Sequence, residues 1–508
     1  MVDNEEETIL PKTGSEKVGQ ESAVITPEKI VSLGLGCIVV SSALFLFFLT
    51  FWIFVLTTQL VPALYVAVGC IFSAIFIGAV AFLTRCSSRI YQKIIGYVLA
   101  ALLAVVCVLG GFALWRTVQT MRAVSDTTVE RSVVSFYALE GSSVATVNDL
   151  DGKGLGVLEE MDRSNTDETI RKAEEEYGMT FSLQEYDSLI SLADALQSDQ
   201  VQGIVLNQAF FPLYEELSGY ETFPSELREL KTQELERVLE HGVQAADSQK
   251  LEPLEDPVVT VLISGSDTRK SVVDQLGRSD VNIIAKINRE THEILLVSTP
   301  RDYYVPLAFS WGNPQDKLTH AGIYGMDVLM GTLEDLYDTQ IDYYFRLNFV
   351  GFTEIIDALG GIEVYSDYDF TAGGHDYHVG INSLNGEEAL SFARERYSFV
   401  DGDRQRGMNQ MAVIEGVLQK ALSPSILTGY LDILESVQDC VDTSVPYQLM
   451  ADMVQCQLSE NASWHVERYS VNGSDASDYT FSMAQKLYVM IPDEATVQEA
   501  KEKLAALG

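Results

Sequence analysis

The chain has 508 residues and a formal net charge of −39 at pH 7. This length allows two or three domains, and so acidic a composition excludes general nucleic-acid binding, which depends on basic surface to neutralise phosphates. The charge is unevenly placed, because residues 1–116 contain seven acids and seven bases while residues 117–508 carry the whole negative excess. We therefore expect two parts of the protein in different environments, and no nucleic-acid partner.

The first part contains three long apolar runs. The runs 31–57, 60–83 and 94–115 include no Asp, Glu, Lys or Arg. Each is close to the ~20 residues that cross a bilayer as a helix. A cleaved signal peptide would be shorter, and here a 29-residue polar tail precedes the first run and two more runs follow it. The sequence therefore predicts a membrane anchor of three transmembrane helices within residues 30–116.

Basic residues in the short loops predict the orientation of this anchor. Arg85, Arg89 and Lys93 lie between the second and third runs, whereas the turn between the first two runs carries no charge. Because basic loops stay on the cytoplasmic side, the 1–29 tail should be cytoplasmic and residues 117–508 extracytoplasmic. We expect a multi-pass protein of the cell membrane.

Two cysteines, Cys440 and Cys456, lie away from the apolar runs, and the other four lie in or beside those runs. An oxidising compartment permits a disulfide between Cys440 and Cys456, and two free thiols are the alternative. The spacing of the cysteines and histidines does not resemble a zinc site.

Residues 117–250 alternate between strand-like and helix-like segments. A helical stalk is expected at 117–132, where the chain leaves the membrane. The pattern then predicts strands at 132–139 and 202–207, a turn at 149–156, and helices around 166–177 and 188–198. Such alternation indicates a small α/β accessory domain. A polar segment with two prolines at 240–257 predicts a linker after it.

Residues 255–425 have a more regular pattern. We predict strands at 258–265, 281–287, 293–299, 341–349 and 360–366, and helices at 326–337, 352–359, 386–394 and 409–422. The fold class that we expect is α/β (α+β), with a central sheet flanked by helices. Residues 426–508 should form a C-terminal extension that packs on this domain.

Charged residues of both signs recur at the ends of the predicted strands, where binding sites are usually built. They are Asp267 and Arg269, Arg278 and Asp280, Arg301 and Asp302, Lys317, and the arginines of ARERYSFVDGDRQRGMNQ at 393–410. Each pair alone is most often a surface turn whose ion pair contributes ~0–1 kcal/mol. Together they suit a divalent metal that holds phosphates, because carboxylates bind Mg²⁺ and guanidinium groups bind phosphate oxygens in pairs. The abundance of arginine favours a pyrophosphate ligand over a small apolar one.

The arginine-rich segment has an expected local geometry. Arg394 and Arg396 would point to nearly opposite sides of a helix, but to the same side of an extended segment. We expect the preceding helix to end near Arg394, so that both arginines converge, and a loop carrying Arg406 to follow. Asn409 and Gln410 would then lie at the N-terminus of the next helix, where free backbone N–H groups favour anions.

The ordered blocks GSDTR, RSD, PRD, KLTHAG, LNFVGFTEIIDALGGIEV, LNGEEALSFARER and GDRQRGMNQ resemble the LytR-CpsA-Psr family. The resemblance covers residues 255–423. Three membrane spans and an α/β accessory domain ahead of these blocks are most similar to the streptococcal capsule-biosynthesis, CpsA-like branch. The resemblance implies a sheet flanked by helices, with an apolar tunnel for a polyprenyl tail.

The resemblance also implies roles for individual residues. Asp267 and Asp280 match metal-binding aspartates, with Mg²⁺ as the expected cofactor and Mn²⁺ as an alternative. Asp403 matches an acidic position that could accept the proton of an attacking hydroxyl, a role also open to Asp302 or a water chain, and Arg404 should face solvent. The implied catalytic residues are Asp403, Arg394 and Arg396, and the implied pyrophosphate ligands are Arg278, Arg301, Arg394, Arg396 and Arg406, with Arg269, Lys317 and Gln410 as weaker members.

The activity that the resemblance implies is that of a membrane-anchored, Mg²⁺-dependent phosphotransferase. It would move a glycan phosphate, such as capsular polysaccharide, from an undecaprenyl-pyrophosphate carrier to peptidoglycan. Its expected partners are this lipid-linked glycan, peptidoglycan, the membrane and capsule-assembly proteins. Two alternatives remain, a polyprenyl-pyrophosphate phosphatase that cleaves the carrier without transfer, and a non-catalytic scaffold or regulator of capsule assembly.

Overall fold

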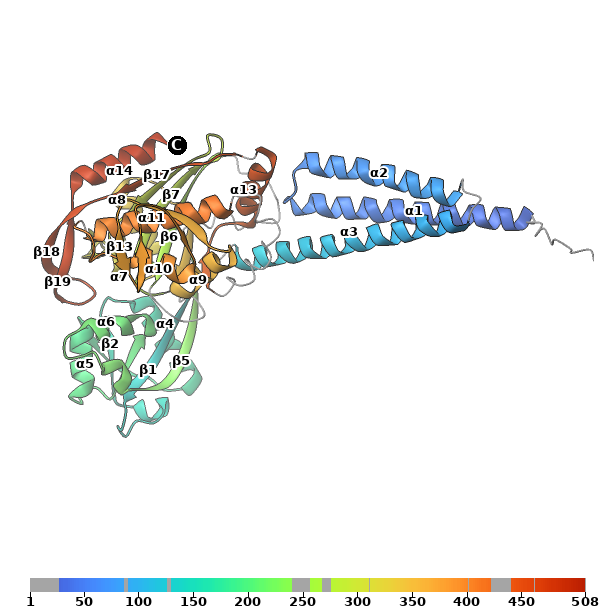
Figure 1. Cartoon of the computed structure of the whole chain (residues 1–508). Coiled ribbons are helices and arrows are strands. Elements are labelled where there is room, and N and C mark those ends of the chain that lie inside the picture. The colour runs from blue at the N-terminus through green and yellow to red at the C-terminus, as the bar shows by residue number, and fades with distance from the viewer. Residues whose placement is uncertain are drawn as a thin grey trace, which may run out of the picture. The chain divides into compact units, whose positions relative to one another are not determined.

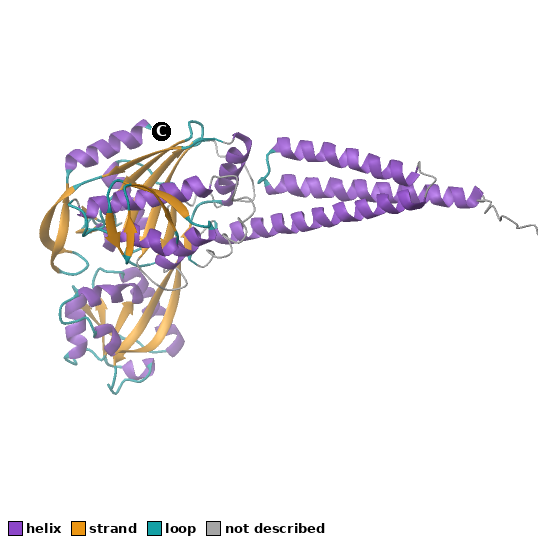
Figure 2. Ribbon diagram, in the orientation of Figure 1, coloured by secondary structure: helices purple, strands orange, loops and turns teal. Residues whose placement is uncertain are grey.

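The structure is a computed structural model that describes residues 27–85, 90–125, 129–239, 256–266, 276–309, 311–400, 402–421, 440–460 and 462–507. The chain divides into two compact units, one of Met1–Phe54 with Ala63–Gly110 and the other of Val55–Pro62 with Gly111–Gly508. Figure 1 labels the helices and strands, and Figure 2 colours them by type. The predicted linker lies outside the described residues, apart from residues 256 and 257.

Three apolar helices form the N-terminal part of the chain. Helix α1 spans Pro27–Thr58, α2 spans Ala63–Arg85 and α3 spans Ile90–Val124. Each contains a stretch long and apolar enough to cross a membrane, of 20, 22 and 34 residues respectively. Large apolar side chains such as Leu64 and Ile71 are exposed on them, as suits helices surrounded by lipid. The described helices therefore support the predicted three-helix membrane anchor.

The helical stalk predicted at 117–132 is shorter than expected. Helix α3 ends at Val124, and the chain is already in strand β1 from Val129. Strand pairing explains the difference, because Val129 lies opposite Val238 and Glu130 opposite Arg237 on a neighbouring strand. Backbone hydrogen bonds to that strand outweigh the weak helical preference of this polar segment.

The accessory domain contains a five-stranded sheet with the order β3-β2-β4-β1-β5. Its strands are β1 (Val129–Leu139), β2 (Gly154–Leu158), β3 (Ser182–Tyr186), β4 (Gly203–Asn207) and β5 (Leu227–Val238). Its helices are α4 (Arg163–Tyr177), α5 (Leu189–Gln197) and α6 (Phe211–Glu216). The two longer helices were predicted within a few residues. Strand β5 was not, because its exposed, charged sequence is typical of an edge strand rather than of a buried one.

A carboxylate is held between polar groups at the start of α4. Asp162 accepts hydrogen bonds from Asn165 Nδ2 at 2.6 Å and from Asn207 Nδ2 at 2.7 Å. Loss of solvent raises the pKa of Asp162 to about 6, although the two amide hydrogen bonds oppose that rise. The folded state therefore favours the protonated form more strongly than the unfolded chain does.

Asp162 is expected to make stability depend on pH. Because its pKa is raised on folding, its contribution is fully present below its unfolded pKa of ~3.9 and is lost as pH rises through about 6. Between pH 5 and pH 7, the wild-type protein should lose ~1–2 kcal/mol relative to an Asp162→Asn variant. Calorimetric melting of the full-length chain at both pH values measures this difference. An Asp151→Asn variant, which changes an exposed aspartate of the same domain, serves as the control. An equal offset for Asp162→Asn at both pH values would contradict the assignment.

The second domain that follows the apolar helices, here called the large domain (residues 256–507 as described), contains a six-stranded sheet with the order β16-β11-β6-β7-β8-β17. Its strands are β6 (Val258–Ser266), β7 (Val281–Asn288), β8 (Glu293–Ser298), β11 (Tyr343–Asn348), β16 (Val441–Thr443) and β17 (His465–Ser470). Strand β7 runs antiparallel to β6 and β8, while β11 is parallel to β6 and β17 is parallel to β8.

Helices cover both faces of this sheet. Leu262, Ile284 and Val297 face the side covered by α8 (Met326–Tyr337) and α14 (Glu494–Ala506). The alternate residues Ile283, Ala285 and Leu296 face Met411 on α11 (Gly402–Ala421). A further cluster joins α11 to α9 (Phe349–Ala358), α10 (Gly386–Arg394) and the small strand pair β12 (Ile362–Ser366) and β15 (Gly380–Leu384). The predicted fold class, a central sheet flanked by helices, is therefore confirmed.

The residues after 440 are part of the same fold. Strand β17 extends the sheet beyond β8, and β16 extends it beyond β11. A hairpin of β18 (Gly473–Thr480) and β19 (Gln485–Pro492) follows β17 and precedes α14. Helix α13 (Tyr447–Glu460) places Leu449 and Met453 against β6.

Cys440 and Cys456 are not joined by a disulfide in the structure, so the thiol alternative is the arrangement that it has. Cys440 is buried, with its Sγ 3.4 Å from Glu354 Oε2 on α9. Cys456 lies on α13, with its Sγ 3.5 Å from His292 Nε2. Each thiol thus faces a different part of the large domain.

Candidate active site

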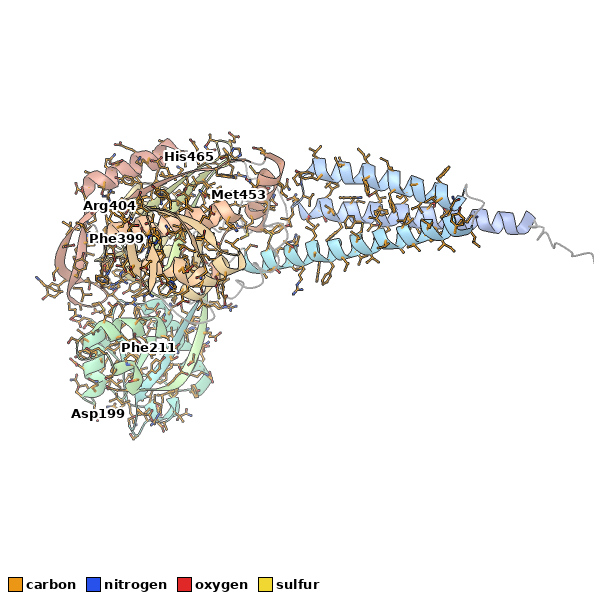
Figure 3. The ribbon with its side chains drawn as sticks, in the orientation of Figure 1. Asp199, Phe211, Phe399, Arg404, Met453 and His465 are labelled. Atoms are coloured by element: carbon orange, nitrogen blue, oxygen red, sulfur yellow. The ribbon has the colours of Figure 1, made fainter. Side chains whose placement is uncertain are left out.

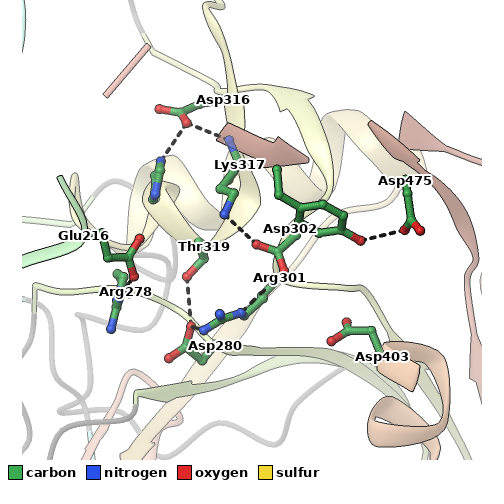
Figure 4. A network of polar contacts seen from close by, with 12 residues as sticks. Glu216, Arg278, Asp280, Arg301, Asp302, Asp316, Lys317, Thr319, Asp403 and Asp475 are labelled. Atoms are coloured by element: carbon green, nitrogen blue, oxygen red, sulfur yellow. Dashed lines mark hydrogen bonds and ion pairs between the residues drawn. The ribbon is translucent and has the colours of Figure 1, made fainter. Parts of the chain in front are cut away.

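The ends of three adjacent strands bring charged residues together at one edge of the large sheet. Because β7 runs antiparallel to β6 and β8, the residues after β6 and β8 meet the residues before β7. Backbone hydrogen bonds hold the segments there, from Asp280 N to Gly265 O at 2.8 Å and from Thr319 N to Arg301 O at 2.9 Å. We call the resulting group the edge cluster, which consists of Asp280, Arg301, Asp302, Lys317, Thr319 and Asp403, labelled in Figure 4, together with Arg406, the ion-pair partner of Asp403.

Arg301 is at the centre of the edge cluster. Its Nη1 donates to Asp280 Oδ1 at 2.8 Å, and its Nε lies 3.6 Å from Asp302 Oδ2. Thr319 Oγ1 donates to the same Asp280 oxygen at 3.1 Å. Burial alone would lower the pKa of Arg301, but the carboxylates of Asp280 and Asp302 raise it. The guanidinium therefore keeps its positive charge and links the carboxylates on either side of it.

A second ion pair joins the end of β8 to the short strand β10 (Gln315–Lys317). Lys317 Nζ lies 2.8 Å from Asp302 Oδ1, and both side chains are almost fully buried. Burial would raise the pKa of Asp302, but Lys317 and Arg301 together hold it below its ordinary value. Asp302 is therefore ionised and weakly basic, which makes it a poor proton acceptor.

The first turns of α11 bring Asp403 and Arg406 to the same edge. Gly407 permits this approach, because a Cβ atom there would lie only 2.6 Å from Ser298 Oγ on β8. Asp403 and Arg406 form an ion pair. Burial raises the pKa of Asp403, and the nearby negative charge of Asp302 raises it further. The positive charge of Arg406 lowers it but does not cancel these effects. Of the two candidate bases, Asp403 is thus the better proton acceptor, because its pKa is raised while that of Asp302 is lowered.

The prediction of a loop ahead of this helix is wrong. Residues 402–407 already belong to α11, which begins at Gly402, so Asn409 and Gln410 lie within the helix and not at its N-terminus. Asp403 and Arg406 are three positions apart and pair on one helix face, which favours the helical conformation. Asn409 is buried and donates to the Phe392 carbonyl at 3.3 Å, and Gln410 is partly buried.

Arg394 and Arg396 leave the end of α10 toward different neighbours. The helix ends at Arg394 and Glu395 is extended, as predicted. The Arg394 guanidinium lies 4.6 Å from the centre of the Phe349 ring. Arg396 stacks on Tyr397 at 4.7 Å, and its charge is close enough to oppose the raised pKa of Asp403. Arg396 therefore contacts Tyr397 and acts on Asp403 through its charge, while Arg394 packs on Phe349 of α9, so the two side chains have different neighbours and do not share the contact that was predicted for them.

The remaining predicted residues are Arg278, Asp267, Arg269 and Arg404. Arg278 forms an ion pair with Glu216 on α6 of the accessory domain (Figure 4). Asp267 and Arg269 lie outside the described residues. Arg404 is exposed, as expected for a residue without a role in the site (Figure 3).

A buried arginine near the site lies outside the predicted motifs. Arg346 on β11 has no exposed surface, and its Nη2 donates to the Gly277 carbonyl at 2.9 Å. Its Nη1 lies 3.5 Å from Met326 Sδ. Arg346 thereby holds the backbone that leads into Arg278 and Asp280. Its signal in the sequence was an arginine at an inward position of an alternating strand.

A tyrosine of the C-terminal hairpin was also missed. Tyr488 on β19 donates to Asp475 Oδ1 at 2.8 Å, and the amide of Met490 on the same strand donates to the Asp302 carbonyl at 2.7 Å. Burial raises the pKa of Tyr488, and the charges of Asp475 and Asp302 raise it further. Its hydroxyl therefore stays protonated beside the edge cluster. The contact is tertiary and left no local pattern in the sequence.

A buried hydrogen-bond network around Asp316 holds the backbone of Lys317 in place. Asp316 accepts hydrogen bonds from the Lys317 and Ser482 amides at 2.7 and 2.8 Å, and its Oδ1 lies 2.7 Å from His320 Nδ1. Burial would raise the pKa of Asp316, but His320 and Ser482 lower it below its ordinary value. The ionised carboxylate fixes the backbone from which Lys317 reaches Asp302.

Fold and site together define a membrane-anchored α/β protein with a carboxylate–guanidinium cluster at a sheet edge. A family model, the LytR_cpsA_psr family, matches residues 227–506, which is more than half of the chain. The chain belongs to this family, and the predicted resemblance is confirmed. The match begins ahead of residue 255 and continues beyond residue 423, so it includes β5 and the C-terminal strands.

Two similar relatives have the same printed name, polyisoprenyl-teichoic acid–peptidoglycan teichoic acid transferase TagU. The protein of Bacillus cereus is 38% identical over 196 residues, which are 38% of this chain and 63% of the relative. The protein of Bacillus mycoides is 33% identical over 269 residues, or 52% of this chain and 82% of the relative. The match to the first of these thus spans less than two thirds of that relative's length.

Among solved structures, the crystal structure of B. subtilis TagV is similar, with 26% sequence identity and a TM-score of 0.42. The similarity covers 50% of this chain and 98% of that one.

Proposed function

We propose that this protein is a membrane-anchored phosphotransferase that attaches a lipid-carried glycan to peptidoglycan. The observation that carries the proposal is the edge cluster, in which Arg301, Arg406 and Lys317 meet three carboxylates at one sheet edge. The names of the relatives describe transfer of a polyisoprenyl-linked polymer to peptidoglycan. We further propose capsular polysaccharide on undecaprenyl pyrophosphate as the donor, because the anchor and accessory domain resemble the capsule-biosynthesis branch.

The proposed reaction exchanges one phosphorus–oxygen bond for another. A peptidoglycan hydroxyl attacks the phosphorus that carries the glycan, the bond from that phosphorus to the bridging oxygen breaks, and polyprenyl phosphate leaves. Asp403 accepts the hydroxyl proton, a role that its raised pKa favours. Fixed positive groups neutralise the charge that develops on the phosphate oxygens, which is the main requirement of phosphoryl transfer. The residues proposed for this are Arg301, Lys317, Arg396 and Arg406, with Arg269, Arg278, Arg394 and Gln410 as further ligands.

Hard oxygen donors at the edge cluster fit a magnesium ion. Asp280 supplies a carboxylate and Thr319 a hydroxyl beside it, and Mg²⁺ prefers such oxygen ligands. We propose that Asp280, with Asp267 from outside the described residues, holds Mg²⁺ or Mn²⁺. When bound, the ion would supply positive charge at the pyrophosphate.

The proposed orientation places the edge cluster where lipid-linked donors are presented. Residues 1–29 would be cytoplasmic and residues 117–508 extracytoplasmic. The basic loop between the second and third spans supports this orientation.

Transfer by the purified full-length protein tests the proposal. The protein in detergent is incubated with an undecaprenyl-pyrophosphate oligosaccharide and a peptidoglycan oligomer, with Mg²⁺ or with EDTA. We expect a phosphodiester-linked adduct with Mg²⁺, its loss in EDTA, and its return when Mg²⁺ or Mn²⁺ is added back. Free phosphorylated sugar without adduct would instead identify a polyprenyl-pyrophosphate phosphatase. If neither product forms and Arg301→Ala cells still attach the glycan, the protein is a scaffold or regulator.

A further inference from the structure

Three side chains of the kinds that bind zinc meet at the turn between β7 and β8. They are His292 in that turn and Cys456 and Glu460 on α13, and their ligand atoms all lie within 4.8 Å of one another. The His292 Nε2 atom is 3.5 Å from Cys456 Sγ and 3.1 Å from Glu460 Oε2. One imidazole nitrogen therefore faces both a thiol and a carboxylate.

The helical repeat of α13 explains why the two helix residues point to this turn. Leu449 and Met453 pack on the sheet, and Cys456 and Glu460 continue the same face at positions i+7 and i+11 from Leu449. The side of α13 that is apolar at its start thus becomes polar and ligand-bearing at its end. A helix that only packed on the sheet would not require a cysteine, or a glutamate aimed at a histidine, at these positions.

The backbone and ring of His292 are held from other directions. His292 has a left-handed backbone with φ 57°, which is uncommon for a residue with a side chain. Its carbonyl accepts from the His465 amide at 2.9 Å, and the Trp464 ring packs edge-on against its imidazole at 5.1 Å. Such supporting contacts fix the orientation of a metal-binding imidazole.

The distances from His292 Nε2 to the other two ligand atoms are close to those around a tetrahedral zinc ion. With Zn–S and Zn–N bonds of ~2.3 and ~2.05 Å, tetrahedral angles place sulfur and nitrogen ~3.6 Å apart, and nitrogen and oxygen ~3.4 Å apart. The two distances from the imidazole nitrogen are 3.5 and 3.1 Å, each within a few tenths of an ångström of these values, and all three ligand atoms lie within 4.8 Å of one another. Glu460 is half exposed, which leaves a path for the ion and room for a water as fourth ligand.

We propose that His292, Cys456 and Glu460 bind one divalent metal ion of the zinc type, at a site separate from the edge cluster. The site lies at the opposite end of β7 and β8 from Asp280 and Arg301. Its mixed sulfur, nitrogen and oxygen donors select Zn²⁺ or Co²⁺ over Mg²⁺. By joining α13 to the β7–β8 turn, the ion fastens the helix to the sheet, so its role is structural and does not depend on the proposed transferase activity.

Cobalt substitution of the full-length, tag-free protein tests this site. The protein in detergent is stripped with EDTA, given excess Mg²⁺ to fill sites of hard oxygen donors, and titrated with Co²⁺. We expect one Co²⁺ per chain, a near-ultraviolet thiolate-to-cobalt band and strong visible bands of a tetrahedral ion. One equivalent of Zn²⁺ should displace these bands and raise the melting temperature. A wild-type protein without the thiolate band would overturn the proposal.

Matched variants connect the signal to the three residues. Cys456→Ser should abolish the thiolate band, whereas Cys440→Ser, which changes the other cysteine of the large domain, should keep it. Glu460→Gln changes an exposed side chain, so it should fold and should bind Co²⁺ at least ~10-fold more weakly while keeping the band. Persistence of the band in Cys456→Ser, or its loss in Cys440→Ser alone, would contradict the site.

Discussion

Arg301→Ala is expected to lower the rate of glycan transfer by at least ~10³-fold. Arg301 pairs with Asp280, the carboxylate proposed to hold the metal, and its Nε lies 3.6 Å from Asp302 Oδ2, while its charge lowers the pKa of Asp403 against the effect of burial. Its removal takes away a fixed positive charge where negative charge develops on the phosphate, and also leaves Asp280 without its guanidinium partner. The rate of adduct formation from the undecaprenyl-pyrophosphate oligosaccharide measures the effect.

Two further variants make this result interpretable. Arg301→Lys keeps the charge but loses the paired donors, so it should recover only part of the activity. Arg404→Ala removes an exposed arginine from the same helix that carries Arg406, and it should stay within ~2-fold of wild type. Equal losses for Arg301→Ala and Arg404→Ala would point to a general effect of net charge. A rate for Arg301→Ala above about a tenth of wild type would remove Arg301 from the proposed mechanism.

The elements that could be predicted from sequence are those whose pattern of apolar side chains indicates a buried strand or helix. Strands β6, β7 and β8 are apolar on both faces, and α8 has the bounds predicted from its apolar spacing. Strands β5 and β18 have charged or small polar sequences, LRELKTQELERV and GSDASDYT, and are held by backbone pairing with β1 and β19. Backbone pairing leaves little trace in side-chain pattern, so such strands were missed.

Some residues of the candidate site could likewise be predicted from the sequence, and others could not. The convergence of Asp280, Arg301 and Lys317 could be anticipated, because blocks at strand ends meet when the strands are neighbours. The contribution of Tyr488 could not, since it depends on where a later hairpin packs. His292 and Cys456 are 164 positions apart, and this is why no zinc spacing was visible in the sequence.

Arg346→Met is expected to lower the free energy of unfolding by ~2–4 kcal/mol. Arg346 is fully buried, and methionine fills much of the space of its stem without replacing the donors. The Gly277 carbonyl would lose its hydrogen bond from Nη2, and a buried region that includes Asp442 would lose a positive charge. Since ~1 kcal/mol shifts the melting temperature of a domain of this size by ~2–4 °C, a decrease of ~5–15 °C should be seen by calorimetry of the full-length protein.

Arg131→Met provides the matched control for Arg346→Met. Arg131 is 66% exposed and pairs with Glu236 on the surface of the accessory domain, so the same substitution should cost no more than ~0.5 kcal/mol there. If Arg346→Met melted within ~2 °C of wild type, the buried guanidinium would contribute no net stability. If both variants lost several degrees, the cause would be the added methionine or the reduced positive charge, not the loss of a donor to Gly277. A large loss for Arg346→Met alone would show that a residue outside the recognised motifs holds the segment that carries Asp280.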